Sequence, residues 1–564
     1  MTRFRARTAA VAAFATGAAA LSVLPAPTAS AAPGHSAQRE SHSTHDDLRF
    51  DPTDYTTITV TIDGQLEHVR WYKEVCYVAN PVEALPTQTN VAGQPMTISN
   101  TACGYQSMNV FVPESAADDP ETAIYFAVNN GGWWASYVRA SVTDGATYDS
   151  TKSNVGAALK AGYVFVDVAT RSRGMTAADG TWGGKAPSPV VDAKAAVRYL
   201  RLNDKRFPGS AERIVVNGTS GGGALTAIIG ASGNSPDYYP YLAEIGAAGI
   251  TAGGRSTIRD DILAANAYCP ITDLGNADPA YEWLYAYYGT REKVATSNND
   301  PVDSEMIASW FAAYEKSLSL RNPNGSRLTA KTMIKAISDE VSRSAETFMA
   351  AGGTVPDIGD NIIITNRDGS TTTYVNDWID VDNDAATVIS IDMERYLAFV
   401  ASQATLKTVP AFDAFGVNGF GTTGRTESNL FGTSDQLYSN YTRFSWENNE
   451  ITGDGVGTDD TGLTWAEYVR SSETIVGDQL DLINPMKYIG TGADTAPYWY
   501  VRHGTRDRDT AFTVSINLDR ALKADHTVKD VDYQLAWDTA HAGNYDVPEA
   551  MAWIADVLER ADRA

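Results

Sequence analysis

Four mainly apolar runs constrain the fold of this chain more than any other feature of its sequence. They are AIYFAV (123–128), YVFVDVA (163–169), RIVVNG (213–218) and ILAANAY (262–268). Helix-compatible segments such as VVDAKAAVRYLRLND (190–204) separate them. Strands that are apolar along their whole length and alternate with helices are typical of a mostly parallel sheet with helices on both faces. The pattern therefore predicts an α/β fold.

Further strand-like runs come before this region and long after it. The early runs are TTITVTI (56–62), HVRWYKEVCYV (68–78) and MNVFVP (108–113). Their alternating polarity predicts an antiparallel start to the sheet. The late runs are YWYVRHG (498–504) and VDYQLAW (531–537), and a final helix over about 547–562 follows them. The sequence thus predicts a core in two parts, 51–273 and 481–564.

The segment between the two core parts, residues 274–480, does not continue the strand–helix alternation. It contains long amphipathic helical stretches and one apparent hairpin, 361–375, with Asp368 and Gly369 as its turn. A chain of 564 residues also exceeds what a single core usually supports. We therefore expect an inserted lid domain over 274–480.

The N-terminal residues have the layout of an export signal. Arg3, Arg5 and Arg7 precede an apolar, alanine-rich stretch, and Ala29-Ser30-Ala31 offers small residues for cleavage. This layout predicts a signal peptide over 1–31, a disordered polar leader over 32–50, and a secreted, extracellular protein. A membrane anchor is the alternative, but the apolar stretch is short and no stop-transfer charge cluster follows it.

The charge balance excludes some partners. The chain has 44 Lys and Arg against 69 Asp and Glu, a formal net charge of −25. An acidic surface repels phosphate backbones and anionic membranes, so neither nucleic acid nor membrane insertion after signal cleavage is expected.

The three cysteines allow two interpretations. In an oxidising compartment Cys76 and Cys103 would pair across neighbouring strands and leave Cys269 as a buried thiol. Three unpaired core thiols are the alternative. The chain has no CxxC motif, HExxH motif or histidine cluster, so we expect neither a metal nor another cofactor.

A candidate nucleophile stands between a predicted strand and a predicted helix. Residues 218–222, GTSGG, match the pattern G-x-S-x-G, follow RIVVN and lead into GGALTAIIGASG. In this setting a sharp turn projects the serine hydroxyl above the sheet, and the helix N-terminus faces a developing negative charge. The alternative is a glycine-rich turn with a passive serine. The context favours Ser220 as a nucleophile.

The base follows by elimination among seven histidines. In α/β-hydrolases the chain order is serine, acid, histidine. His35, His42 and His45 lie in the leader and His68 in the antiparallel start, so all four precede Ser220 and cannot meet this order. His526 lies in a polar helix-to-strand connection, on the far side of the predicted sheet. His503 is followed by only one strand and leaves no room for an acid at the end of a preceding strand. His541 remains, in the loop after the last predicted strand.

The acid is expected in the loop that follows YWYVRHG. Asp507 is closer to the strand end than Asp509, which is the alternate acid. Either carboxylate could instead be a solvated loop residue paired with Arg506 or Arg508.

An oxyanion hole needs two backbone N–H groups near the reacting carbonyl. Gly221 supplies one, because it directly follows the nucleophile. Gly131 and Gly132 lie in NNGGW (129–133) after the strand AIYFAV, where they parallel the HGGG-type loop of esterases. A plain turn is the alternative for this loop.

Several stretches together resemble the bacterial tannases with an α/β-hydrolase core and a large lid. They are residues 185–209, RIVVNGTSGGGAL (213–225), AYCPITDL (267–274), KTVPAFDA (407–414), ESNLFG (427–432), RHGTRDRDT (502–510) and AHAGNYD (540–546). The resemblance extends over most of the chain from about residue 120 and includes Ser220, Asp507 and His541.

The resemblance implies a serine esterase that hydrolyses galloyl esters, with a small aromatic ester as its substrate. It also implies that Lys407, Glu427 and Asp509 hold the three hydroxyls of the galloyl ring. A feruloyl or general carboxylesterase with the same triad is the nearest alternative. A non-catalytic binding protein on a hydrolase fold would be expected to lack one member of the triad.

Overall fold

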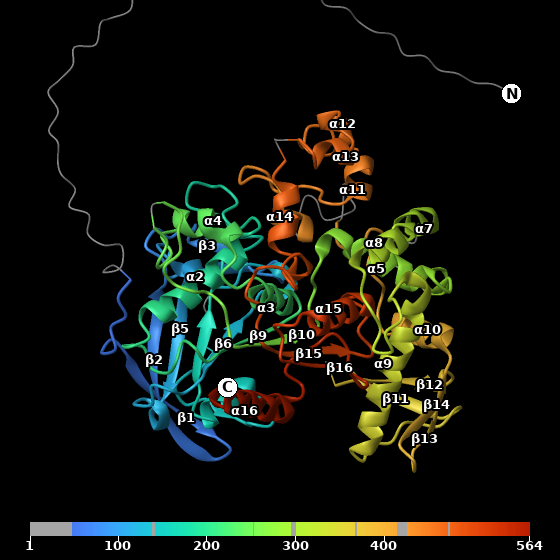
Figure 1. Ribbon diagram of the computed structural model, residues 1–564, viewed down its shortest axis with the longest axis horizontal. Coiled ribbons are helices and arrows are strands. Elements are labelled where there is room, and N and C mark those ends of the chain that lie inside the picture. Colours follow the sequence, from blue (N-terminus) through green and yellow to red (C-terminus); the bar gives the residue numbers. More distant parts are fainter. Residues whose placement is uncertain are drawn as a thin grey trace, which may run out of the picture. The chain divides into compact units, whose positions relative to one another are not determined.

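The computed structural model describes residues 48–137, 141–251, 253–294, 300–366, 369–413, 426–471 and 474–563. Its centre is a ten-stranded sheet (Figure 1). The strands are β1 (Thr56–Ile62), β2 (Gln65–Cys76), β5 (Ser107–Pro113), β6 (Ile124–Val128), β7 (Thr147–Tyr148), β8 (Val164–Val168), β9 (Ile214–Thr219), β10 (Ala264–Tyr268), β15 (Tyr498–Gly504) and β16 (Asp530–Ala536). Their order across the sheet is β16-β15-β10-β9-β6-β8-β5-β2-β1-β7.

The direction of the strands confirms the predicted fold class. β1, β2, β5 and β8 pair antiparallel in succession. From β8 to β16 every pair is parallel. The parallel strands β6, β8 and β10 are buried at every position, which explains why their sequences are mainly apolar. Asp167 of β8 and Asn266 of β10 are the buried polar exceptions.

Helices cover both faces of the sheet. The covering helices are α1 (Asn154–Lys160), α2 (Ser188–Leu202), α3 (Gly221–Ala231), α15 (Phe512–Ala524) and α16 (Val547–Asp562). Side chains of α2, α3 and α15 pack with one set of strand residues, including Phe126 and Val216. Side chains of α1 and α16 pack with the alternate set, including Tyr125 and Val215. This two-sided packing is the α/β-hydrolase arrangement that the sequence predicts.

The lid segment lies between β10 and β15, which are neighbours in the sheet. Its helices are α5 (Leu274–Ala286), α6 (Thr290–Lys293), α7 (Pro301–Ser309), α8 (Phe311–Leu318), α9 (Ala330–Ala350), α10 (Met393–Ser402), α11 (Arg443–Asn448), α12 (Gly457–Thr461), α13 (Trp465–Tyr468) and α14 (Val476–Leu482), with the 3-10 turns η5 (Glu427–Leu430) and η6 (Pro485–Lys487). Its strands form two hairpins, β11 (Asn361–Thr365) with β12 (Thr371–Val375) and β13 (Ile379–Asp382) with β14 (Thr387–Ile391).

The first hairpin occupies the predicted range 361–375, while Asp368 of its expected turn lies outside the described residues. The chain from Thr44 on forms one compact unit, so the lid packs onto the core. The domain boundaries remain predictions, and residues 1–31 and most of the leader lie outside the described part of the chain.

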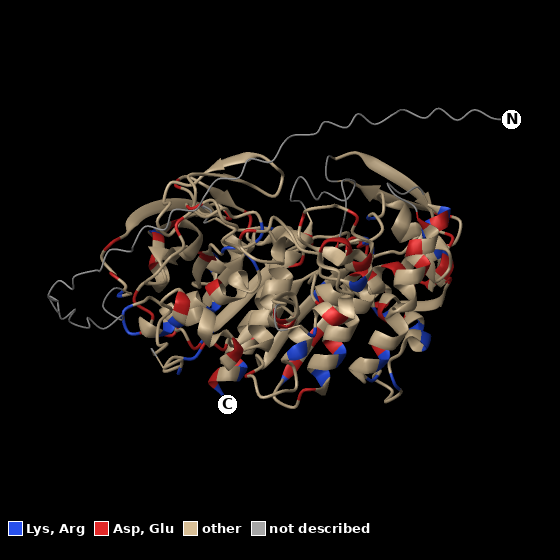
Figure 2. Ribbon diagram, turned by 90° about the horizontal axis from the view of Figure 1, so that it is seen from above, with Lys and Arg blue, Asp and Glu red and all other residues tan. Residues whose placement is uncertain are grey.

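Short elements complete the fold. They are β3 (Thr87–Thr89), β4 (Pro95–Thr97), α4 (Tyr239–Glu244) and the 3-10 turns η1 (Gly104–Gln106), η2 (Glu114–Ala116), η3 (Gly131–Trp133) and η4 (Pro236–Tyr238). Acidic and basic residues mingle on the outer helices, whereas the central strands carry few charges (Figure 2). Within the described ranges, no helix is both long and apolar enough to cross a membrane.

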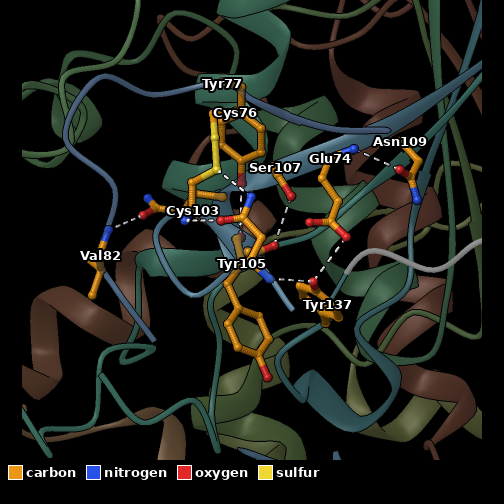
Figure 3. The surroundings of a disulfide bond; sticks show 12 residues. Glu74, Cys76, Tyr77, Val82, Cys103, Tyr105, Ser107, Asn109 and Tyr137 are labelled. Atoms are coloured by element: carbon orange, nitrogen blue, oxygen red, sulfur yellow. Dashed lines mark hydrogen bonds between the residues drawn. A yellow bond between two sulfur atoms is a disulfide. The ribbon is translucent and has the colours of Figure 1, made fainter. Parts of the chain in front are cut away.

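A disulfide joins the end of β2 to the segment before η1. Cys76 and Cys103 are bonded (Figure 3), whereas Cys269 is a free, buried thiol. The first of the two interpretations of the cysteines is therefore confirmed. Around the bond, the hydroxyl of Tyr137 donates to the Glu74 carboxylate at 3.3 Å, so polar contacts also hold this corner of the fold.

Candidate active site

Ser220 stands on a tight turn between β9 and α3. Its backbone has φ 62° and ψ −122°, a region that non-glycine residues adopt only when surrounding contacts impose it. Those contacts come from the neighbouring strand: Ser220 N–H donates to the carbonyl of Tyr268 at 2.9 Å, and Ile271 N–H donates to the carbonyl of Ser220 at 3.3 Å. The strain is consistent with a turn that holds the hydroxyl in one direction.

The glycines after Ser220 allow α3 to approach the end of β6. A Cβ atom on Gly221 would lie 2.1 Å from the backbone nitrogen of Trp133, and one on Gly222 would lie 2.6 Å from the carbonyl oxygen of Val128. Any side chain at either position would collide with backbone. The absence of side chains therefore brings the start of α3 against the loop that follows β6.

The loop after β6 contains the second candidate donor of an oxyanion hole. Two of its amides are already hydrogen-bonded within the loop. The N–H of Gly131 donates to the carbonyl of Asn129 at 3.0 Å, and the N–H of Trp133 donates to the carbonyl of Asn130 at 2.8 Å. The amide of Gly132 takes part in none of the loop and turn hydrogen bonds found across the described ranges. Of the two predicted glycines, only Gly132 therefore retains an amide that is available to a ligand.

Arg173, just after β8, fixes the position of Gly132. Its Nε donates to the Gly132 carbonyl at 2.6 Å, and its guanidinium lies 5.3 Å from the centre of the Trp134 ring. Gly221 is the first residue of α3, so its N–H has no acceptor within the helix. The two available amides, of Gly132 and Gly221, thus belong to elements in direct contact.

Asp507 and His541 form a hydrogen bond at the carboxyl edge of the sheet. His541 Nδ1 lies 2.7 Å from Asp507 Oδ2, with the Asp507 side chain fully buried and that of His541 18% exposed. The other oxygen of Asp507 accepts the N–H groups of Asp509 at 2.8 Å and Thr510 at 3.3 Å. The carboxylate that contacts His541 is therefore that of Asp507, while Asp509 pairs with Arg508 at 2.8 Å.

The electrostatics of this pair favour an ionised carboxylate beside a basic imidazole. Burial opposes the charge on Asp507, but His541 and then His503 outweigh it and hold the pKa of Asp507 well below its usual value. Burial likewise opposes a charge on His541, yet the Asp507 carboxylate raises the pKa of His541 well above its usual range. The imidazole is thus a stronger base than a free histidine.

His503 is a second histidine on the same carboxylate. Its Nε2 lies 3.2 Å from Asp507 Oδ2, without good hydrogen-bond alignment. Its Nδ1 lies 2.8 Å from the hydroxyl of Ser515, and its side chain is fully buried. The carboxylate of Asp507 therefore lies between two imidazoles.

The loop that carries His541 lies against the turn that carries Ser220. A Cβ atom on Gly543 would lie 1.9 Å from Thr219 Oγ1, and the Asn217 side-chain amide donates to Asn544 Oδ1 at 3.2 Å. The fold thus brings the predicted nucleophile segment and the predicted base segment into contact.

Cys269, directly after β10, contacts the loop that carries His541. Its thiol donates to the carbonyl of Ala542 at 3.1 Å. Burial raises the pKa of this thiol, so it remains a protonated donor. Its sulfur, a carboxylate oxygen of Asp507 and a ring nitrogen of His541 all lie within 4.8 Å of one another.

Two of the three predicted ring-binding residues lie on segments joined by Tyr281 of α5. The N–H of Lys407 donates to the Tyr281 hydroxyl at 3.2 Å, and that hydroxyl donates to the carbonyl of Arg508 at 2.9 Å. The residue after Arg508 is Asp509. The Lys407 ammonium lies 4.6 Å from the centre of the Phe412 ring.

The third predicted ring-binding residue, Glu427, is 7% exposed at the start of η5. Its Oε1 lies 3.5 Å from Nη2 of Arg173, the residue that holds Gly132. Glu427 is thereby connected to the oxyanion-hole loop, and Lys407 to the acid loop. Residues 414–425, most of the segment between Lys407 and Glu427, lie outside the described part of the chain.

Comparisons with known proteins agree with this architecture. A tannase from Fusobacterium nucleatum superposes with a TM-score of 0.70 at 28% identity, covering 91% of this chain and 99% of that one. A tannin acyl hydrolase solved with ethyl gallate superposes with a TM-score of 0.69 at 27% identity, covering 92% of this chain and 100% of that one. The chain is a tannase-like α/β-hydrolase.

Sequence comparisons add shorter matches to this tannase-like hydrolase. The family model described as BD-FAE matches residues 108–251. The esterase LipC of Mycobacterium tuberculosis is 38% identical over 58 residues, which are 10% of this chain and 14% of that protein. Among solved structures, a tannin acyl hydrolase from Lactobacillus plantarum is a further nearly full-length match, with a TM-score of 0.67 at 26% identity, covering 91% of this chain and 99% of that one.

Sequence reasoning about this tannase-like hydrolase missed four residues of the site. They are His503, Cys269, Arg173 and Tyr281. Two carried a signal in the sequence: His503 and Cys269 each stand where a predicted parallel strand ends, which is where ligands and catalytic groups gather. The other two have no such signal, because the backbone groups that they bind come from distant segments.

Proposed function

We propose that this protein is a secreted serine esterase that hydrolyses galloyl esters through Ser220, His541 and Asp507. The observation that carries the proposal is the hydrogen bond between the buried Asp507 carboxylate and His541. The loop of His541 packs against the strained turn of Ser220. The near full-length likeness to tannases supports the choice of ester.

In the proposed mechanism the hydroxyl of Ser220 attacks the ester carbonyl while His541 accepts its proton. The carbonyl oxygen becomes an oxyanion that receives hydrogen bonds from the N–H groups of Gly132 and Gly221. When the tetrahedral intermediate collapses, His541 returns the proton to the departing alcohol. Water then attacks the acyl-enzyme by the same steps and releases the acid. Asp507 orients the imidazole and stabilises its charged form.

Recognition of the ring is assigned to Lys407, Glu427 and Asp509. A galloyl ring presents three adjacent hydroxyls, and a site built to pair them rejects rings that lack them, because its own polar groups would stay unsatisfied. The contacts of Lys407 and Glu427 with the acid loop and the oxyanion-hole loop support this assignment. A feruloyl ring carries a methoxy group and one hydroxyl and satisfies fewer of these partners.

Secretion is part of the proposal. The export signal over 1–31 and the Cys76–Cys103 disulfide support it, because disulfides persist in oxidising compartments. N-terminal sequencing of protein collected from the culture medium should find a chain that begins at or within two residues of Ala32. Uncleaved protein retained in the cells would argue against export.

The activity is tested by hydrolysis of methyl gallate and methyl ferulate in parallel, with Ser220→Ala as the blank. We expect a strong preference for methyl gallate and no activity in the blank. Preference for methyl ferulate with an inactive blank would support the proposed triad and contradict the assignment of galloyl esters as substrates. Full activity of Ser220→Ala would overturn the mechanism.

Glu427→Gln tests the ring-binding assignment separately from the chemistry. We expect a raised KM for methyl gallate, of at least tenfold, and an unchanged rate with p-nitrophenyl acetate, which has no ring hydroxyls. An equal loss with both esters would assign Glu427 a structural role instead.

A further inference from the structure

A cavity lies between the lid and the core, apart from the candidate active site. It has a volume of about 360 Å³, which is at the lower end of the range for small-molecule sites. Lid residues of α9, β11, β13 and α10 form one wall, and the residues directly after β15 and β16 form the other. Neither the proposed triad nor the proposed ring-binding residues line it. Figure 1 shows these lid elements gathered beyond β16, at one end of the sheet.

Aromatic side chains dominate the walls. The rings of Phe348 and Trp537 stack with centres 6.2 Å apart, and those of Trp378 and Trp537 lie 5.9 Å apart. Trp378 also stacks on Phe399 at 5.5 Å. These mutual contacts hold the rings in place along the wall of the cavity. A wall of fixed rings favours an aromatic ligand, because offset-stacked and edge-to-face ring pairs stabilise beyond their area.

The polar groups of the cavity select for an uncharged ligand. Arg506 is 2.7 Å from Asp538, and its Nη1 donates to Gln403 Oε1 at 3.0 Å, so its charge is already paired. Asp538 is 46% exposed and offers an acceptor to a hydroxyl. The indole N–H of Trp378, in a side chain only 3% exposed, has no acceptor among the described residues.

The opening of the cavity is apolar as well. Ile363 is 62% exposed and Phe348 is 37% exposed, and both line the cavity. Large apolar side chains left this exposed beside a concave aromatic surface are typical of a ligand entrance.

We propose that this cavity is a second binding site, which takes an uncharged phenolic ring. The ring stacks on the aromatic walls, and its hydroxyl donates to Asp538 at the rim. A benzoate-like anion is disfavoured, because no unpaired cation lines the cavity in the described part of the chain. The proposal does not depend on the triad or on the preference for galloyl esters.

The proposed second site adjoins the segment that carries Asp507 of the candidate active site. Thr505 and Arg506 line the cavity and directly precede Asp507. The hydroxyl of Tyr396, another wall residue, donates to the Thr505 carbonyl at 2.6 Å. A ligand that packs on this wall therefore contacts the segment that carries the proposed catalytic acid.

Fluorine NMR of 4-fluorophenol, with 4-fluorobenzoate as the charged comparison, tests the proposal on the full chain. We expect 4-fluorophenol to bind and 4-fluorobenzoate to bind at least tenfold more weakly. Thr354→Trp should fill the cavity, because Thr354 is an exposed wall residue whose replacement spares the core. Ile363→Lys is a second variant at the entrance, and Thr387→Trp, exposed on β14 and outside the lining, is the matched control.

Binding that weakens at least tenfold in Thr354→Trp and Ile363→Lys, but not in Thr387→Trp, supports the proposal. Three outcomes would overturn it: no binding of 4-fluorophenol, equal binding in all variants, or loss of binding in Glu427→Gln, which would place the probe at the candidate active site. Since the probe is not an ester, failure here leaves the test with methyl gallate unaffected.

The phenolic ring can come from a multi-ring ester substrate or from a free phenol, and kinetics distinguishes the two sources. If the ring belongs to the substrate, Thr354→Trp raises KM for a multi-ring ester and leaves that for methyl gallate unchanged. If the ligand is a free phenol, added phenol changes the rate with methyl gallate in the wild type and not in Thr354→Trp.

Discussion

At the scale of single residues, the carboxylate of Asp507 contacts several parts of the candidate site. One oxygen accepts two backbone amides and the other faces two imidazoles. A carboxylate held in this way has a fixed direction. Its pKa is low because the two imidazoles favour its charged form by more than burial opposes it. The bond to His541 in turn fixes which ring nitrogen faces the acid.

Asp507→Asn should lower kcat/KM for methyl gallate by about 10⁴-fold, as loss of the orienting acid does in serine hydrolases. The base must be neutral to act, so activity rises as pH rises through the pKa of His541. Because the Asp507 carboxylate raises that pKa, its removal should move the acidic limb of the pH–rate profile to lower pH.

Asp509→Asn is the comparison variant. It should raise KM and leave the acidic limb of the pH–rate profile in place. An acidic limb that moves in Asp509→Asn would identify Asp509 as the acid.

His503→Gln and His503→Leu test whether the second imidazole positions Asp507. The contact of His503 with Asp507 is not an aligned hydrogen bond, so we expect it to be worth about 1 kcal/mol and His503→Leu to lower kcat by about fivefold with KM unchanged. His503→Gln keeps a polar amide near Asp507 and should recover part of the rate. A purely structural role predicts that loss of rate follows loss of folded protein, which circular dichroism of both variants would reveal.

The sequence permits prediction of those site residues whose setting is local. Ser220 lies in a motif between a strand and a helix, and His541 and Asp507 follow the last two strands in the required order. Local pattern cannot reveal Arg173, because its partners Gly132 and Glu427 reach it only through the folded chain.

At the scale of elements, one buried lysine anchors the lid turn that carries Glu427. Lys185, in the segment before α2, donates to the carbonyls of Asn429, Phe431 and Leu437 at 2.9, 2.9 and 3.0 Å. Three carbonyls satisfy all three donors of an ammonium. This single side chain therefore ties η5 and the turn after it to the core.

Lys185→Met should lower the free energy of unfolding by about 3 kcal/mol, because it leaves three carbonyls without their donor at ~1 kcal/mol or more each. Urea denaturation measures this loss. Lys205→Met, at an exposed position in the turn after α2, is the control and should be neutral. If the two variants were equally stable, Lys185 would not anchor the lid.

Strands and helices were predictable where a continuous sequence pattern extends over seven or more residues. The expected strands 56–62 and 498–504 and the helix 547–562 coincide with β1, β15 and α16. The pairing of β1 with β7 was not predictable, because β7 has two residues and contacts β1 from a distant part of the chain. Two residues carry no alternation from which a strand could be read.

At the scale of the whole molecule, the disulfide ties down the corner where β2 ends. Cys76 and Cys103 close a loop with a sequence separation of 27. In the chain-entropy model a cross-link of this span stabilises the folded state by about 3–4 kcal/mol, through the unfolded chain that it constrains.

Cys76→Ser with Cys103→Ser should therefore unfold at lower urea, by a free energy of about 3–4 kcal/mol. Dithiothreitol should shift the wild type towards the variant and leave the variant itself unchanged. Equal midpoints for the oxidised wild type and the double variant would show that the bond does not contribute to stability.

The adjacency of β10 and β15 determines the order in which the chain can assemble. The entire lid is synthesised between these two neighbouring strands, so the edge of β10 that pairs with β15 has no partner until the ribosome has nearly finished. Unpaired edges template aggregation, and pairings between distant segments form slowly. Because Asp507 and His541 also belong to this last segment, a nascent or truncated chain lacks two members of the proposed triad, and we expect it to stay inactive until synthesis is complete.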